Sequence, residues 1–425
     1  MKKISHILVS AVLLFLVTHQ AQAQFTADLE IRPRAEFRNG FKALKSDGDD
    51  PAFFVEQRSR LYFQYSEEKI KVKLVLQDVR LWGENSQIFK TDNALFNVFE
   101  AWGSYKLGDK SLIKVGRQAL DYDNARILGN LAWAQQARSH DLAKYEYNAD
   151  QFKLHIGAAF NQEDLNSRPE PARLTSTFYS GVNNYKTMQY VWVNQKYDQG
   201  NTSLLILNNG VQAADSTINF SQTVGLYSKN KFGKIGLTGE LYHQFGQAIS
   251  GVDLSAWMVS LALSHHGDKN TFTIGGDHLT GTASGSTQSN SFTPLYGTNH
   301  KFYGLMDYFY VGNPFGDVGL TDLYAKWKVT IKNKSSLAVH LHQFLSGVDL
   351  SAEFTSAPEN TLGTEVDLVY NLQVDKAVNL KIGYSQMFAT SSMELLKGGN
   401  QELFQNWGWV MLTIKPRLFT LAKEN

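Results

Sequence analysis

The chain has 425 residues, 43% of them hydrophobic, and its 41 Lys and Arg residues nearly balance 40 Asp and Glu residues, which leaves a formal net charge of +1. This balance argues against general electrostatic attraction to nucleic acid. The absence of cysteine excludes disulfides and a lipid anchor on an N-terminal cysteine. Since no segment approaches about eighteen uninterrupted apolar residues, a membrane-spanning helix is excluded as well.

The N-terminus has the three parts of a secretory signal peptide. Met1-Lys2-Lys3 is the charged part, residues 7–17 form an apolar run, and Ala21-Gln22-Ala23 is a cleavage site of small residues. The apolar run is too short for a helix that stays in the bilayer. We therefore predict a signal peptide over residues 1–23, export across the inner membrane, and a mature domain over residues 24–425.

The first predicted strand alternates strictly between apolar and polar residues. From Phe25 to Arg38, every odd position is apolar, every even position is polar, and six of the seven even positions are charged. A strand sends alternate side chains to opposite faces, so one face suits lipid and the other suits water. No soluble core would accept six charges on one strand face, and this pattern is typical of an outer-membrane barrel with an aqueous interior.

Similar alternation recurs along the chain in about eighteen segments, a number within the range of bacterial outer-membrane barrels. The predicted strands are residues 25–38, 53–65, 70–82, 95–107, 111–119, 140–147, 151–161, 187–197, 202–209, 219–229, 235–245, 252–264, 270–278, 321–332, 335–344, 363–373, 378–388 and 404–415. We therefore predict an all-β fold, a transmembrane antiparallel β-barrel in a Gram-negative outer membrane. Its expected partners are outer-membrane lipid and the barrel-assembly machinery.

The connections between these strands are in turn long and short. The short ones contain Gly, Asn and Asp, as in Gly108-Asp109-Lys110, and these residues tolerate the backbone of tight turns. Long extracellular loops and short periplasmic turns follow, with both chain ends in the periplasm because the strand count is even. Residues 300–310 are aromatic enough to be a strand, but they would break this order. We expect them to belong to a long loop, 279–320, that folds inward, and an ordinary strand is the alternative.

Charged residues gather on the polar face of the first strands. Arg32 and Arg34 on the first strand and Arg58 and Arg60 on the second come within cross-strand reach of one another. Further members of this predicted group are Arg80, Arg117 and Arg126, with acidic residues Glu30, Glu36, Glu56, Asp78, Glu100 and Asp141 among or near them. Either the arginines face passing carboxylates, which they grip bidentately, or they mostly neutralise the acids and stiffen the wall. Both alternatives leave a channel.

A series of short motifs accompanies these charges along the chain. They are Arg32-Pro33-Arg34-Ala35-Glu36, Gln57-Arg58-Ser59-Arg60, Glu100-Ala101-Trp102, Val115-Gly116-Arg117-Gln118, Ala125-Arg126-Ile127-Leu128-Gly129, Asp141, His300-Lys301-Phe302-Tyr303-Gly304 with Asp307, and Gly319-Leu320 with Asp322. In this order they resemble the alginate export family of outer-membrane proteins. The resemblance spans most of residues 25–330.

This resemblance implies an eighteen-stranded barrel with an arginine-lined constriction that passes an anionic polysaccharide. Carried over by motif, the lumen network would contain Arg32, Arg34, Arg58, Arg60, Arg117 and Arg126, with Glu100 and Asp141 as acidic partners. Two features depart from the pattern. Only Arg417 follows Arg173, so the far wall lacks an arginine ring, and the chain ends without the terminal aromatic residue typical of barrel strands. Porins for small acidic solutes share the pattern, so alginate itself is not established.

Other residues offer weaker candidate sites. His340 and His342 share one strand face, but no third metal ligand is recognisable nearby in the sequence. His265-His266 fall at a turn, and the acidic loop with Asp47, Asp49 and Asp50 lacks the full ligand pattern of a calcium loop. We therefore expect no metal and no cofactor.

The sequence thus predicts a channel rather than an enzyme, passing anionic polysaccharide or small carboxylated solutes passively. Two alternatives stay open. A hydrolase with its site on the barrel rim needs a motif that orders Ser, His and Asp, and none is present. A surface adhesin or receptor needs only a blocked lumen. The exact substrate, the direction of transport and the oligomeric state do not follow from the sequence.

Overall fold

The computed structural model describes residues 23–84, 96–162, 184–309, 317–332, 334–350 and 359–422. The predicted signal peptide lies outside these residues except for Ala23, and so do Tyr310 and parts of several predicted loops.

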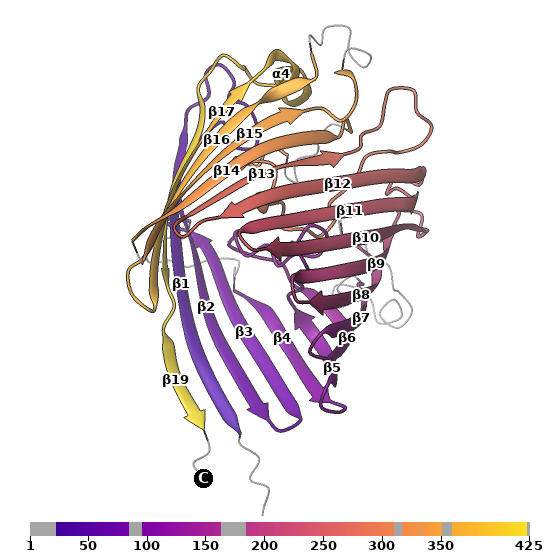
Figure 1. Ribbon diagram of the computed structural model, residues 1–425, viewed down its shortest axis with the longest axis vertical. Helices are drawn as coiled ribbons and strands as arrows, with labels where there is room; N and C mark the ends of the chain where they lie inside the picture. Colours follow the sequence, from indigo (N-terminus) through magenta and orange to yellow (C-terminus); the bar gives the residue numbers. More distant parts are fainter. Residues whose placement is uncertain are drawn as a thin grey trace, which may run out of the picture.

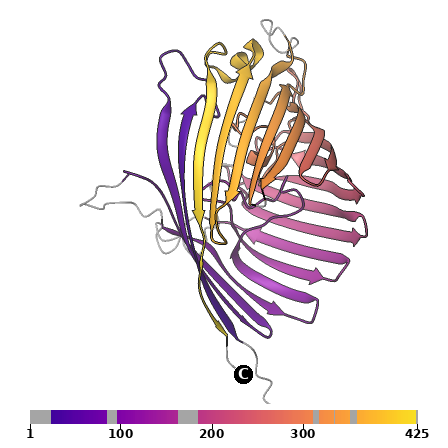
Figure 2. The same cartoon turned by 60° about the vertical axis from the view of Figure 1, so that its left-hand side comes forward.

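The described chain forms one antiparallel sheet that closes into a barrel (Figures 1 and 2). Short turns join the strands at one end of the barrel, the turn end, and mostly longer connections join them at the other, the loop end. The strands are β1 Gln24–Asn39, β2 Ala52–Glu67, β3 Ile70–Leu81, β4 Asn97–Lys106, β5 Ser111–Gln118, β6 His140–Asn148, β7 Phe152–Phe160, β8 Thr187–Tyr197, β9 Gly200–Gln212, β10 Ile218–Phe232, β11 Ile235–Gln247, β12 Asp253–His266, β13 Asn270–Leu279, β14 Leu320–Lys332, β15 Ser335–Leu345, β16 Thr361–Gln373, β17 Val378–Ala389, β18 Gln405–Ile414 and β19 Arg417–Ala422.

The barrel closes through β1, which pairs with β2 on one side and with both β18 and β19 on the other. β18 and β19 are two parts of one wall position, interrupted at Lys415-Pro416, where the proline has no N–H to donate to the ladder. The Pro416 carbonyl still accepts a hydrogen bond from Leu29 N at 3.2 Å. The predicted eighteen-stranded barrel is therefore confirmed. The predicted last strand, residues 404–415, matches β18 to within one residue, and β19, which was not predicted, continues the pairing to Ala422.

Alternation along each strand produces the two faces of the wall. On β12, for example, Val259, Leu261 and Leu263 are exposed on the outer face, whereas Met258 and Ser260 are buried inside. Apolar side chains therefore meet lipid, and the polar ones line the interior. Among the residues that the structure describes, no helix has the length and the hydrophobicity to cross a membrane. Helical structure there includes η2, Asn299–Lys301, and α4, Ser391–Lys397, which Thr390 caps.

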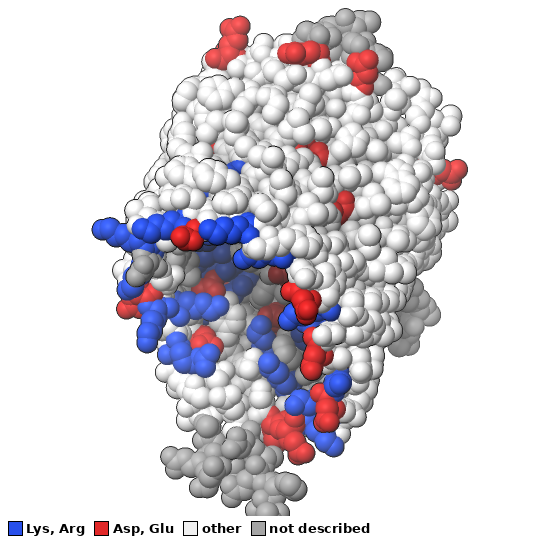
Figure 3. Space-filling view, in the orientation of Figure 1, with Lys and Arg blue, Asp and Glu red and all other residues white. Residues whose placement is uncertain are grey.

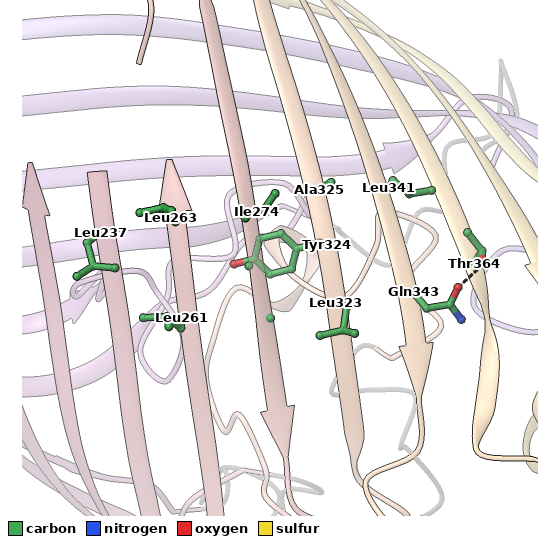
Figure 4. A pocket seen from close by; sticks show the side chains of 12 residues that line it. Leu237, Leu261, Leu263, Ile274, Leu323, Tyr324, Ala325, Leu341, Gln343 and Thr364 are labelled. Atoms are coloured by element: carbon green, nitrogen blue, oxygen red, sulfur yellow. Dashed lines mark hydrogen bonds between the residues drawn. The ribbon is translucent and has the colours of Figure 1, made fainter. Parts of the chain in front are cut away.

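A shallow groove of about 690 Å³ marks the outer face (Figure 4). It forms between Leu261 and Leu323 because Gly276, which faces outward between them, carries no side chain. A Cβ atom on Gly276 would lie 3.0 Å from Leu323 Cδ2. Half of the lining residues are leucine or isoleucine on β11 to β15, so the groove is part of the lipid-facing surface and not of the lumen.

Two long connections fold into the barrel. The β5–β6 loop, residues 119–139, contributes Leu120, Ile127 and Leu128 to a buried hydrophobic cluster. The β13–β14 loop, described over residues 280–309 and 317–319, contributes Tyr296 and residues 302–309 that lie next to them. The two loops pair through Leu128 and Tyr296. The prediction that residues 300–310 belong to an inward loop is confirmed as far as Phe309, and η2 replaces the alternative strand.

Candidate functional site

Arg32 on β1 reaches across the interior to the β5–β6 loop. Its guanidinium group donates to the carbonyl oxygens of Ala132 at 2.7 Å and Trp133 at 3.0 Å, and to Gln135 Oε1 at 2.9 Å. The side chain is buried, with 6% of the residue exposed. Arg32 thus holds the tip of this loop against the wall, and its hydrogen bonds go to neutral acceptors.

The neighbouring Arg34 and Arg58 combine ion pairs with contacts to the same loop. Arg34 pairs with Glu36 at 2.7 Å and Glu56 at 3.0 Å, and it donates to the Trp133 carbonyl at 3.0 Å. Arg58 pairs with Glu30 at 2.5 Å, and its Nη1 lies 3.3 Å from the Ala132 carbonyl oxygen. The structure therefore brings Glu36 and Glu56 to the arginines as the sequence predicts. Carboxylates compensate most of the charge of these two arginines.

Two further predicted residues lie beside this group. Arg60 donates to Gln77 Oε1 at 2.7 Å, and its guanidinium carbon lies 3.7 Å from the centre of the Phe99 ring. Glu100 pairs with Lys73 and accepts a hydrogen bond from Trp102 at 3.1 Å, so its cationic partner is a lysine rather than an arginine.

Arg80, Arg117 and Asp141 lie on the outer face of the barrel, which corrects their predicted place in the lumen. Arg80 is directly opposite Gln57 and so points away from Arg58 and Arg60. Arg117 is opposite Ala101 and Asp141, and its side chain is 43% exposed. It pairs with Asp141 at 2.7 Å. Neighbouring residues of a strand point to opposite faces of the sheet. The short sequence motifs do not show which of the two faces each arginine is on.

Arg126 anchors the β5–β6 loop to the opposite wall. The buried guanidinium group pairs with Asp277 on β13 at 2.9 Å and Glu240 on β11 at 3.3 Å, and it donates to the Tyr303 hydroxyl at 2.9 Å. Burial alone would lower the pKa of Arg126, but Asp277, Tyr303 and Glu240 raise it well above its ordinary value. Arg126 therefore stays charged and ion-paired, and its side chain attaches the β5–β6 loop to β11 and β13.

The β13–β14 loop lies against this first loop and against the wall. Thr298 N donates to the Ala125 carbonyl at 2.8 Å, and the His300 ring stacks on Trp133 with ring centres 4.5 Å apart. Glu365 on β16 accepts hydrogen bonds from the backbone N–H groups of Leu305 at 2.5 Å and Met306 at 2.9 Å. The two loops together span the interior from β1 and β2 to β11, β13 and β16. They fill part of the barrel interior between these strands.

Lysines that the sequence reasoning missed supply free positive charge in the interior. Lys114 on β5, Lys326 and Lys328 on β14 and Lys381 on β17 face inward, because their strand neighbours Val115, Trp327 and Ile382 are exposed outside. None of the four forms an ion pair with a carboxylate that the structure describes. Lys114 instead lies 3.8 Å from the centre of the Trp102 ring.

The charges that act on Lys381 are those of Arg32 and Lys328, both positive. Figure 3 shows Lys and Arg side chains gathered in and around a hollow of the molecule. In the sequence, the alternation Lys326-Trp327-Lys328 indicates that the two lysines share the face opposite to Trp327. The motifs used for the prediction are centred on arginine and do not contain these lysines. The interior thus holds lysines that form no ion pair with a described carboxylate, although Asp322, Asp277 and Asp367 lie near enough to act on Lys326, and Glu146 and Glu100 near enough to act on Lys114.

The fold and the sequence have known counterparts. The sequence matches the family described as Alginate export over residues 23–393. Comparison with the curated proteins finds no match. Among solved structures, Acinetobacter baumannii OccAB4 is 12% identical with a TM-score of 0.62, over 94% of this chain and 99% of that chain. Pseudomonas aeruginosa OccD3 (OpdP) is 11% identical with a TM-score of 0.61, over 93% of this chain and 92% of that chain.

A third solved structure is Pseudomonas aeruginosa OccK2 (OpdF) in complex with glucuronate, 13% identical with a TM-score of 0.60, over 95% of this chain and 100% of that chain. At such identities the likeness to these barrels establishes the fold alone. The family match covers most of the chain, from β1 to β17 with the β5–β6 loop and the described part of the β13–β14 loop, and ends before β18 and β19. The chain is therefore an outer-membrane β-barrel channel that belongs to the alginate export family.

Proposed function

We propose that this channel passes anionic sugars or other small carboxylated solutes passively. The observation that carries the proposal is the group of inward lysines, Lys114, Lys326, Lys328 and Lys381, none of which has an ion-pair partner among the described carboxylates. Charged residues along a pore are a standard device for selecting ions. OccK2 holds glucuronate, a carboxylated sugar, in the same type of barrel, which supports a solute of this class.

The two kinds of cation have different proposed roles. Arg32, Arg34, Arg58 and Arg126 shape the constriction by holding the β5–β6 loop, with Arg60 beside them on the wall and Glu36 and Glu56 as compensating acids. The lysines attract a passing carboxylate without gripping it bidentately, because an ammonium group is a compact point charge. Weak sites in series allow a solute to enter and also to leave. The sugar units of an anionic polysaccharide such as alginate would bind the same sites one after another.

Conductance measurements on the refolded protein in a planar bilayer test this proposal. We expect anion selectivity, measured as the reversal potential in a KCl gradient, and a partial current block by glucuronate that an equal concentration of glucose does not cause. In the triple variant K326Q, K328Q and K381Q, the anion-to-cation permeability ratio should fall by about three-fold or more, since three charges leave the path.

A matched control removes the same charge outside the lumen. Lys69, Lys110 and Lys269 lie exposed on turns, and the variant K69Q, K110Q and K269Q should keep the wild-type ratio. A cation-selective wild-type channel would overturn the anionic substrate. A barrel that folds but conducts no ions would instead favour a surface adhesin or a rim-site hydrolase.

A further inference from the structure

A second polar cluster lies on the inner wall, away from the arginines. His340 and His342 are two residues apart on β15 and share its inner face. The sequence offers them no third ligand, but strand pairing does. Asp367 on β16 is directly opposite His340, and Glu365 is directly opposite His342. A gap of more than twenty residues and a long connection separate these partners in the sequence, so only the register of β15 and β16 brings them together.

Three potential ligand atoms converge in this cluster. His340 Nδ1 and His342 Nε2 each lie 4.0 Å from Asp367 Oδ2, and one ligand atom of each residue lies within 4.8 Å of the other two. Ligands about 2.0–2.1 Å from a tetrahedral zinc ion lie about 3.4 Å from one another. The spacings to Asp367 exceed this by about 0.6 Å, and the two histidine nitrogens lie at most 4.8 Å apart, so side-chain rotations around an ion would close the site.

The neighbours of the three residues orient them in the way that metal ligands are oriented. Asp322 on β14 lies 2.9 Å from His342 Nδ1. An N–H at this Nδ1 leaves the lone pair of Nε2 directed at the cluster, as in the carboxylate–histidine–metal arrangement. Ser385 on β17 donates to Asp367 Oδ1 at 2.5 Å. The contacts with Asp322 and Ser385 involve His342 Nδ1 and Asp367 Oδ1, so His342 Nε2 and Asp367 Oδ2 remain available to bind an ion.

The second oxygen of Asp367 and the nearby Glu365 Oε2 are both buried without a hydrogen-bond partner in the described structure, so this pair needs either a shared proton or a cation. Asp367 has no exposed surface. A buried charged oxygen that lacks a partner is costly, and coordination to a metal ion is one of the ways in which proteins satisfy it. The His340 side chain is 23% exposed, so an ion can enter from the lumen.

The surrounding charges fit a single divalent cation. Asp322, Glu365 and Asp367 contribute carboxyl groups, while Lys326 lies directly opposite His340 and Tyr324 opposite His342. Glu365 also holds the β13–β14 loop through Leu305 N and Met306 N. An ion beside Glu365 would therefore stabilise the part of the wall to which the constriction is attached.

We propose that His340, His342 and Asp367 bind one divalent transition-metal ion of the zinc type, with a coordination position open toward the lumen. Two imidazoles and one carboxylate suit zinc and similar ions rather than calcium or magnesium, which prefer oxygen ligands alone. Lys326 of the proposed solute path lies directly opposite His340, but the binding of an ion by these three residues does not depend on that function.

The test uses the full-length refolded protein, freed of metal by a chelator and titrated with ZnCl₂ alone. We expect one Zn²⁺ per barrel by calorimetry, and X-ray absorption of the loaded protein should show two imidazole ligands. The variants H340Q, H342Q and D367N should each weaken binding by about ten-fold or more, within the range seen when ligand shells are disturbed.

Controls separate loss of the site from loss of the fold. H265Q changes an exposed histidine at the end of β12 and should leave Zn²⁺ affinity unchanged. Heat-modifiable gel migration reports whether each variant forms a barrel, and H340Q is the variant least coupled to the core because its side chain is partly exposed. The proposal is overturned if the wild-type barrel binds no Zn²⁺, or if folded H340Q and D367N bind it as tightly as the wild type.

Discussion

Buried arginines in this barrel bind backbone carbonyls as well as carboxylates. Arg32 alone contacts the carbonyl oxygens of Ala132, Trp133 and Ala134 and the side chain of Gln135. A guanidinium group carries five N–H donors in a rigid plane, so one side chain can satisfy several acceptors at a loop tip. A lysine has three donors on a flexible stem and would hold the loop less firmly. Residue type therefore matches the two proposed roles, with arginines that hold the loops and lysines that attract a passing anion.

Asp123 on the β5–β6 loop is a buried carboxyl group where this loop meets Trp192 on β8 and Ser203 on β9. Trp192 Nε1 donates to its two oxygens at 3.1 and 3.0 Å, and Ser203 Oγ donates at 2.6 Å. Burial raises the pKa of Asp123 from 3.8 to about 6, although these hydrogen bonds oppose the shift. Because the pKa is higher in the docked loop than in a released one, docking is most stable below pH 3.8 and weakens as the pH rises through 6.

We therefore expect open–closed current transitions of the single channel to be more frequent at about pH 7.5 than at about pH 4.5, by on the order of ten-fold. In D123N, whose amide oxygen can still accept from Trp192 and Ser203, the frequency should stay nearly constant between these pH values. A wild-type frequency that does not change with pH, or that falls as the pH rises, would refute this assignment.

At the scale of elements, the β5–β6 loop is held from both sides of the barrel. Arg32 and Gln135 form the contact that is simplest to remove, because no carboxylate partner of Arg32 is left behind when it is replaced. A hydrogen bond to a charged group contributes about 1.5–3 kcal/mol. Loss of the arginine should therefore release the loop tip about ten-fold more often.

Thiol labelling measures that release directly, since the chain has no native cysteine. Leu131 lies at the loop tip with 9% of its surface exposed, and L131C supplies the single thiol. A membrane-impermeant maleimide should label R32Q/L131C about ten-fold faster than L131C alone. R117Q/L131C, with its change on the outer face, should label at the L131C rate. Equal rates in R32Q and R117Q would show that Arg32 does not hold the loop.

Strands were predictable from the sequence, whereas their connections were only partly so. Each of the eighteen predicted strands has a counterpart, because alternation is a local pattern that one strand carries by itself. The break at Pro416 and the further pairing of β19 depend on β1, some 390 residues earlier, which a local pattern does not report. The inward course of residues 300–309 was predicted from the strand order, but the contacts of this segment with Trp133 and Glu365 were not.

At the scale of the whole molecule, the proposed selectivity is an effect of the summed lysine field. Such a field is screened by salt, since the Debye length shrinks from about 10 Å at 0.1 M to about 3 Å at 1 M. The anion-to-cation permeability ratio should therefore fall toward one between these concentrations. Reversal potentials measured at a fixed salt gradient and rising mean concentration check this. A ratio that stays constant up to 1 M would show that anions bind in direct contact rather than follow a field.

The sequence by itself determined the class of molecule: an exported barrel of eighteen strands, a polar interior rich in charge, and the family to which it belongs. These properties depend on composition and on the two-residue period of single strands. Only the tertiary structure decided which charges stay free. Arg32 meets Gln135, Arg126 meets Asp277 and Asp367 meets His340 through strand register and inward loops. Such contacts join residues far apart in the chain, and register reverses a side chain's face with each single step.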